Sequence, residues 1–327
     1  MKHVNVSLFV PHLGCPHACI FCNQKTISGH TEPLKESDIV SACEIAAKCG
    51  HDINNSEIAF FGGSFTAVDR DTMLACLITA APYVGTQFKG IRVSTRPDCI
   101  DGEVLSVLKK YGVTAIELGA QSMKEDVLIK NERGHSPEDT FKASALIREY
   151  GFSLGLQMMT GLYGSTPADD IYTAEQFIKI RPDTVRIYPT VVLENTKLAQ
   201  LYREGVYVPY GFDETVELCA ELLERFTDES IKVIRLGLHS GGNVEDGYVA
   251  GVYHPAFREL CEALIFRSKA EKLLSGKAPG GYLVTVPKGA TSKMTGQKKS
   301  NIVYFSQKGY NLTVRESDGI SGYTVVI

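Results

Sequence analysis

Short apolar runs rich in β-branched residues alternate with amphipathic stretches along roughly the first 240 residues of the chain. Runs of this kind predict buried strands, and the stretches between them predict helices. The expected strands cover residues 5–10, 57–61, 90–95, 114–118, 152–159, 184–190 and 232–238. Strand–helix repetition favours a parallel sheet, because parallel neighbours need a crossover that a helix supplies. We therefore expect an α/β fold with a partial parallel (β/α)6-type barrel.

Several helix ends carry residues with clear positional preferences. Ser136 precedes Pro137, which is the order expected for an N-cap followed by proline at the first helical position. Gly112 and Gly151 stand where glycine commonly ends a helix. These signals support the alternation of strands and helices.

The pattern changes after about residue 240. A glycine-rich stretch leads into an expected helix over roughly residues 255–275, and GKAPGG at 276–281 is typical of a linker. Strand, helix and strand character follows it. The expected division is a barrel over 1–240, a helical connector and linker over 241–281, and a small α+β unit over 282–327.

Charge is distributed unevenly over these parts. The chain has a formal net charge of −4, yet residues 276–327 hold seven Lys or Arg and two Asp or Glu, a balance of +5, which leaves −9 for the rest. Such asymmetry indicates a separate task for the basic tail, although a solvated face is the commoner reason for clustered lysines.

Composition also bears on compartment. With 327 residues, 44% of them hydrophobic, the chain can bury a sizeable core. We find neither an apolar run of membrane-spanning length nor a signal-peptide pattern, so we expect a cytoplasmic protein without membrane contact. Thiols stay reduced there, and the nine cysteines are therefore expected to bind metal or to be buried.

Three cysteines follow the first expected strand, in the segment LFVPHLGCPHACIFCNQ at 8–24. Cys15, Cys19 and Cys22 are separated by three and two residues, at the strand end where parallel barrels place their chemistry. Three thiolates leave one iron of a 4Fe–4S cluster with an open position. A zinc site completed by His17 and coincidental buried cysteines are the alternatives, but no second cysteine pair supports zinc.

This C-x3-C-x2-C segment resembles the signature of the radical S-adenosylmethionine (SAM) superfamily. The resemblance implies that Cys15, Cys19 and Cys22 bind a 4Fe–4S cluster whose open iron binds SAM. A reductant such as flavodoxin or ferredoxin then drives SAM cleavage to a 5′-deoxyadenosyl radical. Phe21 matches the aromatic residue that packs beside the adenine in this superfamily.

Further motifs at later strand ends match the same superfamily. FFGGSF places Gly62 and Gly63 where the SAM amino group binds, and ELGAQS places Gln121 and Ser122 near the adenosine. For Gly62, close backbone approach is the physical reason to lack a side chain.

Three more polar residues complete the implied site. Arg133 in NERGH matches a residue that grips the SAM carboxylate, for which a forked guanidinium is suited. Gln157 in LQMMTGL stands where relatives hold a polar residue for the ribose hydroxyls. Arg96 in STRPD is our first choice for a catalytic residue that faces the substrate.

Other residues at or near strand ends are weaker candidates. Glu117 and Arg186 are equally suited to an ion pair inside the barrel. The remaining cysteines, at 43, 49, 76, 99, 219 and 261, are expected to be buried rather than to form a second cluster. The full set that could face a substrate is Arg96, Glu117, Arg186, Tyr188, Arg235 and His239.

Seven motifs in order, from VPHLGCPHACIFCNQ to RIYPTVVLENTKL, resemble the radical SAM core of the Elongator catalytic subunit. That resemblance implies modification of tRNA. Two departures, the short N-terminal region and the usual cysteine spacing, favour a standalone bacterial Elongator-like protein, and acetyl-CoA chemistry is not implied. A small-molecule enzyme similar to coproporphyrinogen oxidase and a non-catalytic redox protein are the alternatives, although an electron carrier needs no SAM pocket.

The tail is similar to half of a KH domain, in which a G-x-x-G loop between two helices holds nucleic acid. Here the loop reads Gly296-Gln297-Lys298-Lys299, so the second glycine is missing. Lysines can still bind phosphates without that geometry. A structural cap with solvated lysines is the alternative. The candidate RNA contacts are Lys293, Lys298, Lys299 and Lys308.

Overall fold

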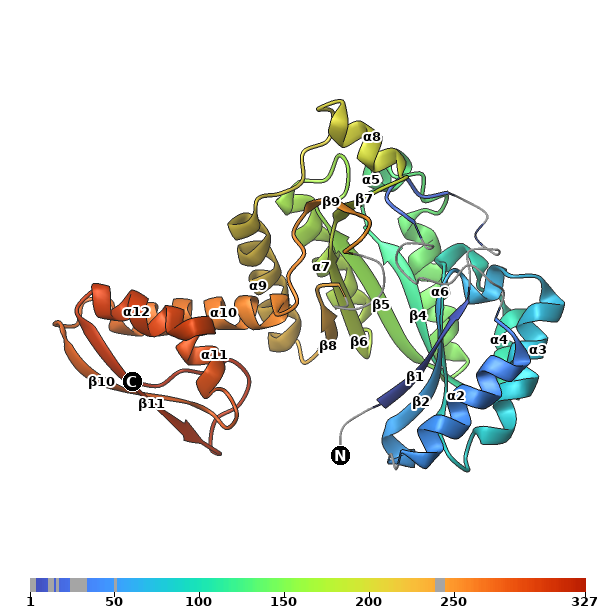
Figure 1. Ribbon diagram of the computed structural model, residues 1–327, viewed down its shortest axis with the longest axis horizontal. Coiled ribbons are helices and arrows are strands. Elements are labelled where there is room, and N and C mark those ends of the chain that lie inside the picture. The colour runs from blue at the N-terminus through green and yellow to red at the C-terminus, as the bar shows by residue number, and fades with distance from the viewer. Residues whose placement is uncertain (1–3, 11–14, 16–17, 24–33, 50–51, 239–244) are drawn as a thin grey trace.

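The computed structural model describes residues 4–10, 15, 18–23, 34–49, 52–238 and 245–327. A curled sheet of seven parallel strands forms its body (Figure 1), in the order β1-β2-β3-β4-β5-β6-β8. All seven predicted strands and the α/β class are confirmed, and the sheet has one strand more than a six-fold barrel. The strands are β1 (Val4–Val10), β2 (Ser56–Gly62), β3 (Gly90–Thr95), β4 (Val113–Gln121), β5 (Ser153–Thr160), β6 (Thr184–Pro189) and β8 (Lys232–Leu236).

Helices connect successive strands and cover one face of the sheet. The capping prediction is confirmed, because Ser136 caps α6 through the backbone N–H of Asp139 and Pro137 is its first residue. Gly112 and Gly151 follow α4 and α6 with φ of 83° and 75°. The helices are α2 (Glu36–Lys48), α3 (Arg70–Ala80), α4 (Gly102–Lys110), α5 (Glu125–Lys130), α6 (Pro137–Glu149), α7 (Pro167–Ile180), α8 (Lys197–Arg203) and α9 (Phe212–Asp228).

The two faces of the sheet differ in chemistry because side chains alternate along each strand. Residues such as Ile58, Ile116 and Ile187 are fully buried and belong to the apolar core shared with the helices. The intervening positions form the concave inner face, which carries charged and polar groups. The inner face therefore needs its own internal pairing.

Glu117 provides that pairing from the middle of β4, where its side chain is fully buried. Its carboxylate accepts hydrogen bonds from Arg186 at 2.5 and 2.9 Å and from Arg92 at 3.2 Å. Arg92 also pairs with Glu57 at 2.7 Å. Gln157 donates to Glu117 at 3.0 Å. The Glu117–Arg186 ion pair considered from the sequence is thus present and joins β4 to β6, and the network as a whole extends from β2 to β6.

A separate C-terminal unit follows, carried on α10 (Phe257–Leu274) at a distance from the sheet (Figure 1). Along the chain this unit consists of a strand, two helices and a second strand, and the two strands pair in parallel. Residues Gly296–Lys299 connect the two helices. β10 starts at Gly280, inside the expected linker, because Gly280 and Gly281 pair with β11. The elements are β10 (Gly280–Pro287), α11 (Thr291–Thr295), α12 (Ser300–Gln307) and β11 (Tyr310–Ser317).

Helix α10 belongs to two cores and is more than a connector. Cys261 and Ile265 lie in the core of the barrel, whereas Phe266 and Ala270 lie in the core of the C-terminal unit. Between them Glu262 is 3% exposed. It pairs with Arg258, Lys293 and the Tyr323 hydroxyl, each at 3.1 Å. The junction is therefore held by both packing and charge.

No helix in the described ranges is both long and apolar enough to cross a membrane.

Glu117→Gln should destabilise the fold by about 3–5 kcal/mol, because it leaves two buried guanidinium groups short of a carboxylate. Burial favours the neutral acid, but Arg186 and then Arg92 outweigh it and hold the pKa of Glu117 below its ordinary value. A depressed folded pKa gives stability that is present above the unfolded pKa of about 4.3 and lost as pH falls through the folded pKa. In urea unfolding at several pH values, the free energy of unfolding of the variant should fall less steeply with decreasing pH than that of the wild type.

The matched control is Glu217→Gln, at an exposed position on α9. It should change stability by no more than about 0.5 kcal/mol. Equal stability of Glu117→Gln and the control would show that the inner-face pairing contributes nothing to folding.

Candidate functional site

The cysteine segment lies at the carboxyl end of β1, where the ends of the parallel strands meet. Cys19 is buried, and Cys15 and Cys22 are partly buried. The Cys22 N–H donates to the Cys19 carbonyl at 3.0 Å, which makes a tight turn. The backbone of Ile20 bonds to Asn131 and to Leu198, at 3.3 and 2.8 Å. The turn is therefore fixed by the end of α5 and the start of α8.

The Arg133 side chain contacts this turn at Cys19. It is 7% exposed, and its Nη1 lies 3.2 Å from Cys19 Sγ. Its Nη2 donates to the Gly119 carbonyl, and its own carbonyl accepts from Arg96. Arg96 is in turn held by Asp98 through two hydrogen bonds of 2.9 and 3.0 Å. Two guanidinium groups are thus locked beside the cysteines.

Four buried polar atoms on Arg96, Arg133, Gln121 and His135 have no hydrogen-bond partner among the described residues, and neither has Asn131 Oδ1. The donors are Arg96 Nη1 and Arg133 Nε, and the acceptors are Gln121 Oε1 and His135 Nδ1. Unpaired buried polar atoms are costly, so such a group points to a ligand. A molecule with both a carboxylate and an ammonium, as in the amino-acid part of SAM, offers what these atoms lack. The residues present therefore fit that cofactor.

His135 lies beside Arg133 and Arg96 in the candidate site, and sequence reasoning missed it. Its Nε2 lies 3.2 Å from the Ala120 carbonyl. Burial, followed by the charges of Arg133 and Arg96, lowers the pKa of His135 to about 3, so the ring is neutral. Nε2 must then carry the proton, which leaves Nδ1 as an acceptor. Its position two residues after Arg133 in NERGH was the available signal.

The glycine pair has a structural reason that is independent of any ligand. Gly62 has φ of +105°, and a Cβ there would lie 2.7 Å from the Val10 carbonyl oxygen. The Gly63 N–H donates to the same carbonyl at 3.0 Å. Close approach of β1 and β2 therefore already requires glycine at position 62.

The four remaining predicted SAM contacts differ in their surroundings. Gln121 ends β4 in a left-handed conformation with φ of 66°. Ser122 is buried and accepts from the Lys124 N–H, so its hydroxyl faces the start of the next helix. Gln157 belongs to the inner-face network through Glu117. Phe21 is partly buried in a small apolar cluster that includes Tyr163.

The other cysteines differ from one another. Those at 43, 76, 219 and 261 are buried, as predicted, whereas Cys49 is exposed and Cys99 is partly buried. Cys99 lies close enough to Cys15 and Arg96 for their charges to affect its pKa, which burial raises. No set of three or more His, Cys, Asp or Glu in the described ranges is gathered as a metal site. His17 and His239 lie outside the described residues.

Comparison with known proteins agrees with this geometry. The Radical SAM superfamily profile matches residues 9–177, and the Radical_SAM C-terminal domain profile matches residues 182–265. An uncharacterised protein of Methanocaldococcus jannaschii is 30% identical over 229 residues, which cover 66% of this chain and 70% of that protein.

One further sequence relative and one solved structure are similar to this chain. The tRNA uridine(34) acetyltransferase of Dehalococcoides mccartyi is 27% identical over 66% of this chain, which spans 55% of that relative. The solved structure of archaeal Methanocaldococcus infernus Elp3 with an N-terminal deletion has a TM-score of 0.61 and 20% identity, over 85% of this chain and 65% of that one. Because the first profile alone covers more than half of its residues, the chain belongs to the radical SAM superfamily of enzymes.

Proposed function

We propose that the protein is a radical SAM enzyme that modifies tRNA. The observation that carries the proposal is the group of four unpartnered buried polar atoms around Arg133, the residue that contacts Cys19. In this proposal Cys15, Cys19 and Cys22 hold a 4Fe–4S cluster, and SAM binds against Arg133 and its neighbours. When bound, the two cofactors supply reductive cleavage of SAM and hydrogen-atom abstraction.

Each residue of the chain then has a definite task. Arg133 Nε and Arg96 Nη1 donate to a carboxylate, while Gln121 Oε1 and His135 Nδ1 accept from donors of the ligand. Gly62 and Gly63 offer backbone to the amino group, Phe21 packs on the adenine, Gln157 faces the ribose, and Gln121 and Ser122 lie near the adenosine at the end of β4. Arg96 borders the substrate side. A one-electron donor such as flavodoxin or ferredoxin reduces the cluster, and we place the reaction in the cytoplasm.

The assignment of tRNA as substrate draws support from the relatives and from the C-terminal unit. Relatives named tRNA uridine(34) acetyltransferase are matched over about half their length, so acetyl transfer is not carried over. In the C-terminal unit the loop between α11 and α12 presents two exposed lysines. Lys298 and Lys299 have φ of 51° and 63° and no ion pair with a described residue. Two successive left-handed lysines are strained, as is common in binding loops.

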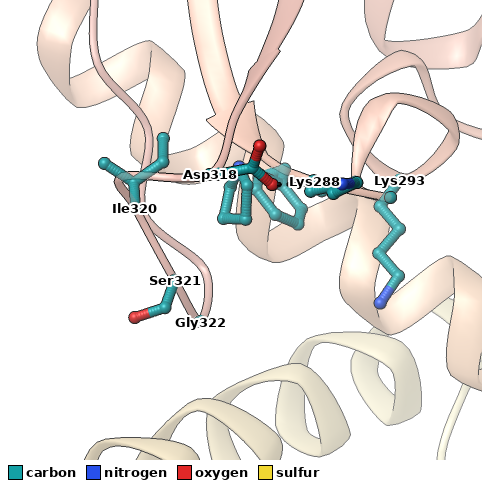
Figure 2. A pocket seen from close by; sticks show the side chains of 10 residues that line it. Lys288, Lys293, Asp318, Ile320, Ser321 and Gly322 are labelled. Carbon is teal, nitrogen blue, oxygen red and sulfur yellow. Dashed lines mark ion pairs between the residues drawn. The ribbon is translucent and has the colours of Figure 1, made fainter.

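The other two candidate lysines are already engaged. Lys293 pairs with Glu262 at 3.1 Å, and Lys308 pairs with Glu271 and Tyr304. Figure 2 shows Lys293 beside a hollow of about 330 Å³, where Lys288 pairs with Asp318 at 3.3 Å. Both lysines at that hollow are neutralised, so we assign the main phosphate contacts to Lys298 and Lys299.

Replacing Cys15, Cys19 or Cys22 with alanine should abolish the absorbance of the reconstituted iron–sulfur cluster and all SAM cleavage. The measurement is anaerobic reconstitution with iron and sulfide, followed by iron analysis and detection of 5′-deoxyadenosine. Cys49→Ala, at the exposed cysteine, should retain both. Tight zinc binding without iron in the wild-type protein would contradict the cluster assignment.

An inventory of the RNA and metabolites that co-purify with the protein tests which substrate it takes. Co-purified tRNA would support the proposal, and a co-purified small molecule would favour the alternative substrate class.

Replacing Lys298 and Lys299 together with glutamine should weaken tRNA binding and reduce its salt dependence. Loss of two phosphate contacts lowers the slope of log affinity against log salt by about 1.4 for single-stranded RNA. SAM cleavage without substrate should be unchanged, because the loop lies outside the barrel. The matched control is the lysine pair at 109 and 110 on α4, also changed to glutamine. Equal tRNA affinity of the Lys298/Lys299 variant and the wild type would make the tail a structural cap.

A further inference from the structure

The edge of the sheet at β8 carries an arginine that the inner-face network does not use. Arg235 is in register with Arg186 of the neighbouring strand β6. Partners in a parallel pair point to the same face, so Arg235 also faces inward, as does Tyr188, two residues beyond Arg186. Arg235 stands one residue before the end of β8 and is half-buried. It therefore lies at the mouth of the barrel.

The charges on the inner face balance without Arg235. Glu57 and Glu117 neutralise Arg92 and Arg186 through the ion pairs of the network. Arg235 makes no ion pair with any described carboxylate, and its Nε donates to the Gly237 carbonyl at 3.0 Å. Burial and the charge of Arg186 lower its pKa, and only the phenols of Tyr188 and Tyr253 act in the other direction. Arg235 is thus an uncompensated, half-buried cation.

The neighbours of Arg235 leave one side of the guanidinium available. With Nε bound to a carbonyl, Nη1 and Nη2 have no hydrogen-bond partner among the described residues, and this end of the fork matches two oxygens of an oxyanion. Tyr188 is half-buried, and its hydroxyl lies 3.5 Å from Arg186 Nη1. Leu238, just beyond the end of β8, and Tyr253 both pack against the small apolar cluster of Val191 and Leu193. A phenol and a guanidinium together can satisfy a phosphate.

We propose that Arg235 and Tyr188 form a phosphate-binding subsite that anchors the substrate at the β8 edge of the barrel. The proposal rests on the proposed function, since it assigns the phosphate to the nucleotide that is modified. Sheet order places this subsite at the strand farthest from β1, which bears the cysteine turn. A nucleotide held there by its phosphate would place its base over the inner face of the sheet.

The experiment uses the full-length, anaerobically reconstituted protein and uridine 5′-monophosphate as the probe, with uridine and malonate as comparison ligands. Dissociation constants come from ligand-observed NMR titration. Arg235→Gln should raise the constant for uridine monophosphate about tenfold, the loss expected for a charge-assisted contact. Arg235→Lys should give a smaller rise, because it keeps the charge and loses the fork. Affinity for uridine should not change.

Lys232→Gln is the matched control, since it removes one positive charge from an exposed position on the same strand. This variant should keep the dissociation constant for uridine 5′-monophosphate within about twofold of the wild-type value, because exposed charges are screened. An equal loss in Lys232→Gln and Arg235→Gln would overturn the subsite, as would wild-type protein that does not bind the nucleotide. Arg235-dependent binding of malonate but not of the nucleotide would overturn the assignment to phosphate.

Thermal unfolding checks that each variant is folded, and Arg235→Lys carries the test should Arg235→Gln fail to fold. The titration requires neither SAM cleavage nor modified tRNA. A failed tRNA assignment with Arg235-dependent nucleotide binding is therefore distinguishable from a failed subsite.

Discussion

The carboxylate of Glu117 is the group on which the polar interior of the barrel depends. It stands fully buried between two guanidinium groups, from β3 and β6, and so links strands that are not neighbours in the sheet. Desolvating these charges is costly, and their mutual hydrogen bonds offset much of that cost. The pairing allows an open sheet to keep a polar concave face. A polar substrate can bind against this polar face, whereas an apolar face would exclude a polar substrate.

The same principle of complete pairing explains why the site stands out. In the network every charge has a partner, and Gln157 is oriented by the same carboxylate. Beside Cys19 the pairing stops: Arg96 and Arg133 are fixed by Asp98 and by backbone carbonyls, yet each keeps one buried N–H without a partner among the described residues. Groups that are held in place but left unsatisfied are pre-organised for a ligand, because no reorganisation is needed when it arrives.

Local sequence signals predicted the strands and helix caps because these features depend on neighbouring residues. The seven strands and the Ser136 cap needed only periodicity and capping preference. The partners of Lys293 and the position of His135 could not be predicted, because both depend on contacts between distant segments. Gly62 shows a third case: glycine was expected there for a ligand, and the Val10 carbonyl already requires it. A motif residue can thus meet a structural and a functional constraint at once.

The junction at Glu262 determines how the C-terminal unit can contribute. α10 packs in both cores, and the buried carboxylate of Glu262 ties Lys293 and Tyr323 of the C-terminal unit to the helix. A unit attached through a shared helix holds a set distance from the barrel, unlike one on a flexible linker. Helices α11 and α12, which flank the loop with Lys298 and Lys299, lie to one side of the sheet, away from it (Figure 1). A small molecule cannot reach both places, whereas a folded RNA can contact the lysine loop while one nucleotide enters the barrel. The rigid separation of the two parts is thus a physical reason to favour a macromolecular substrate.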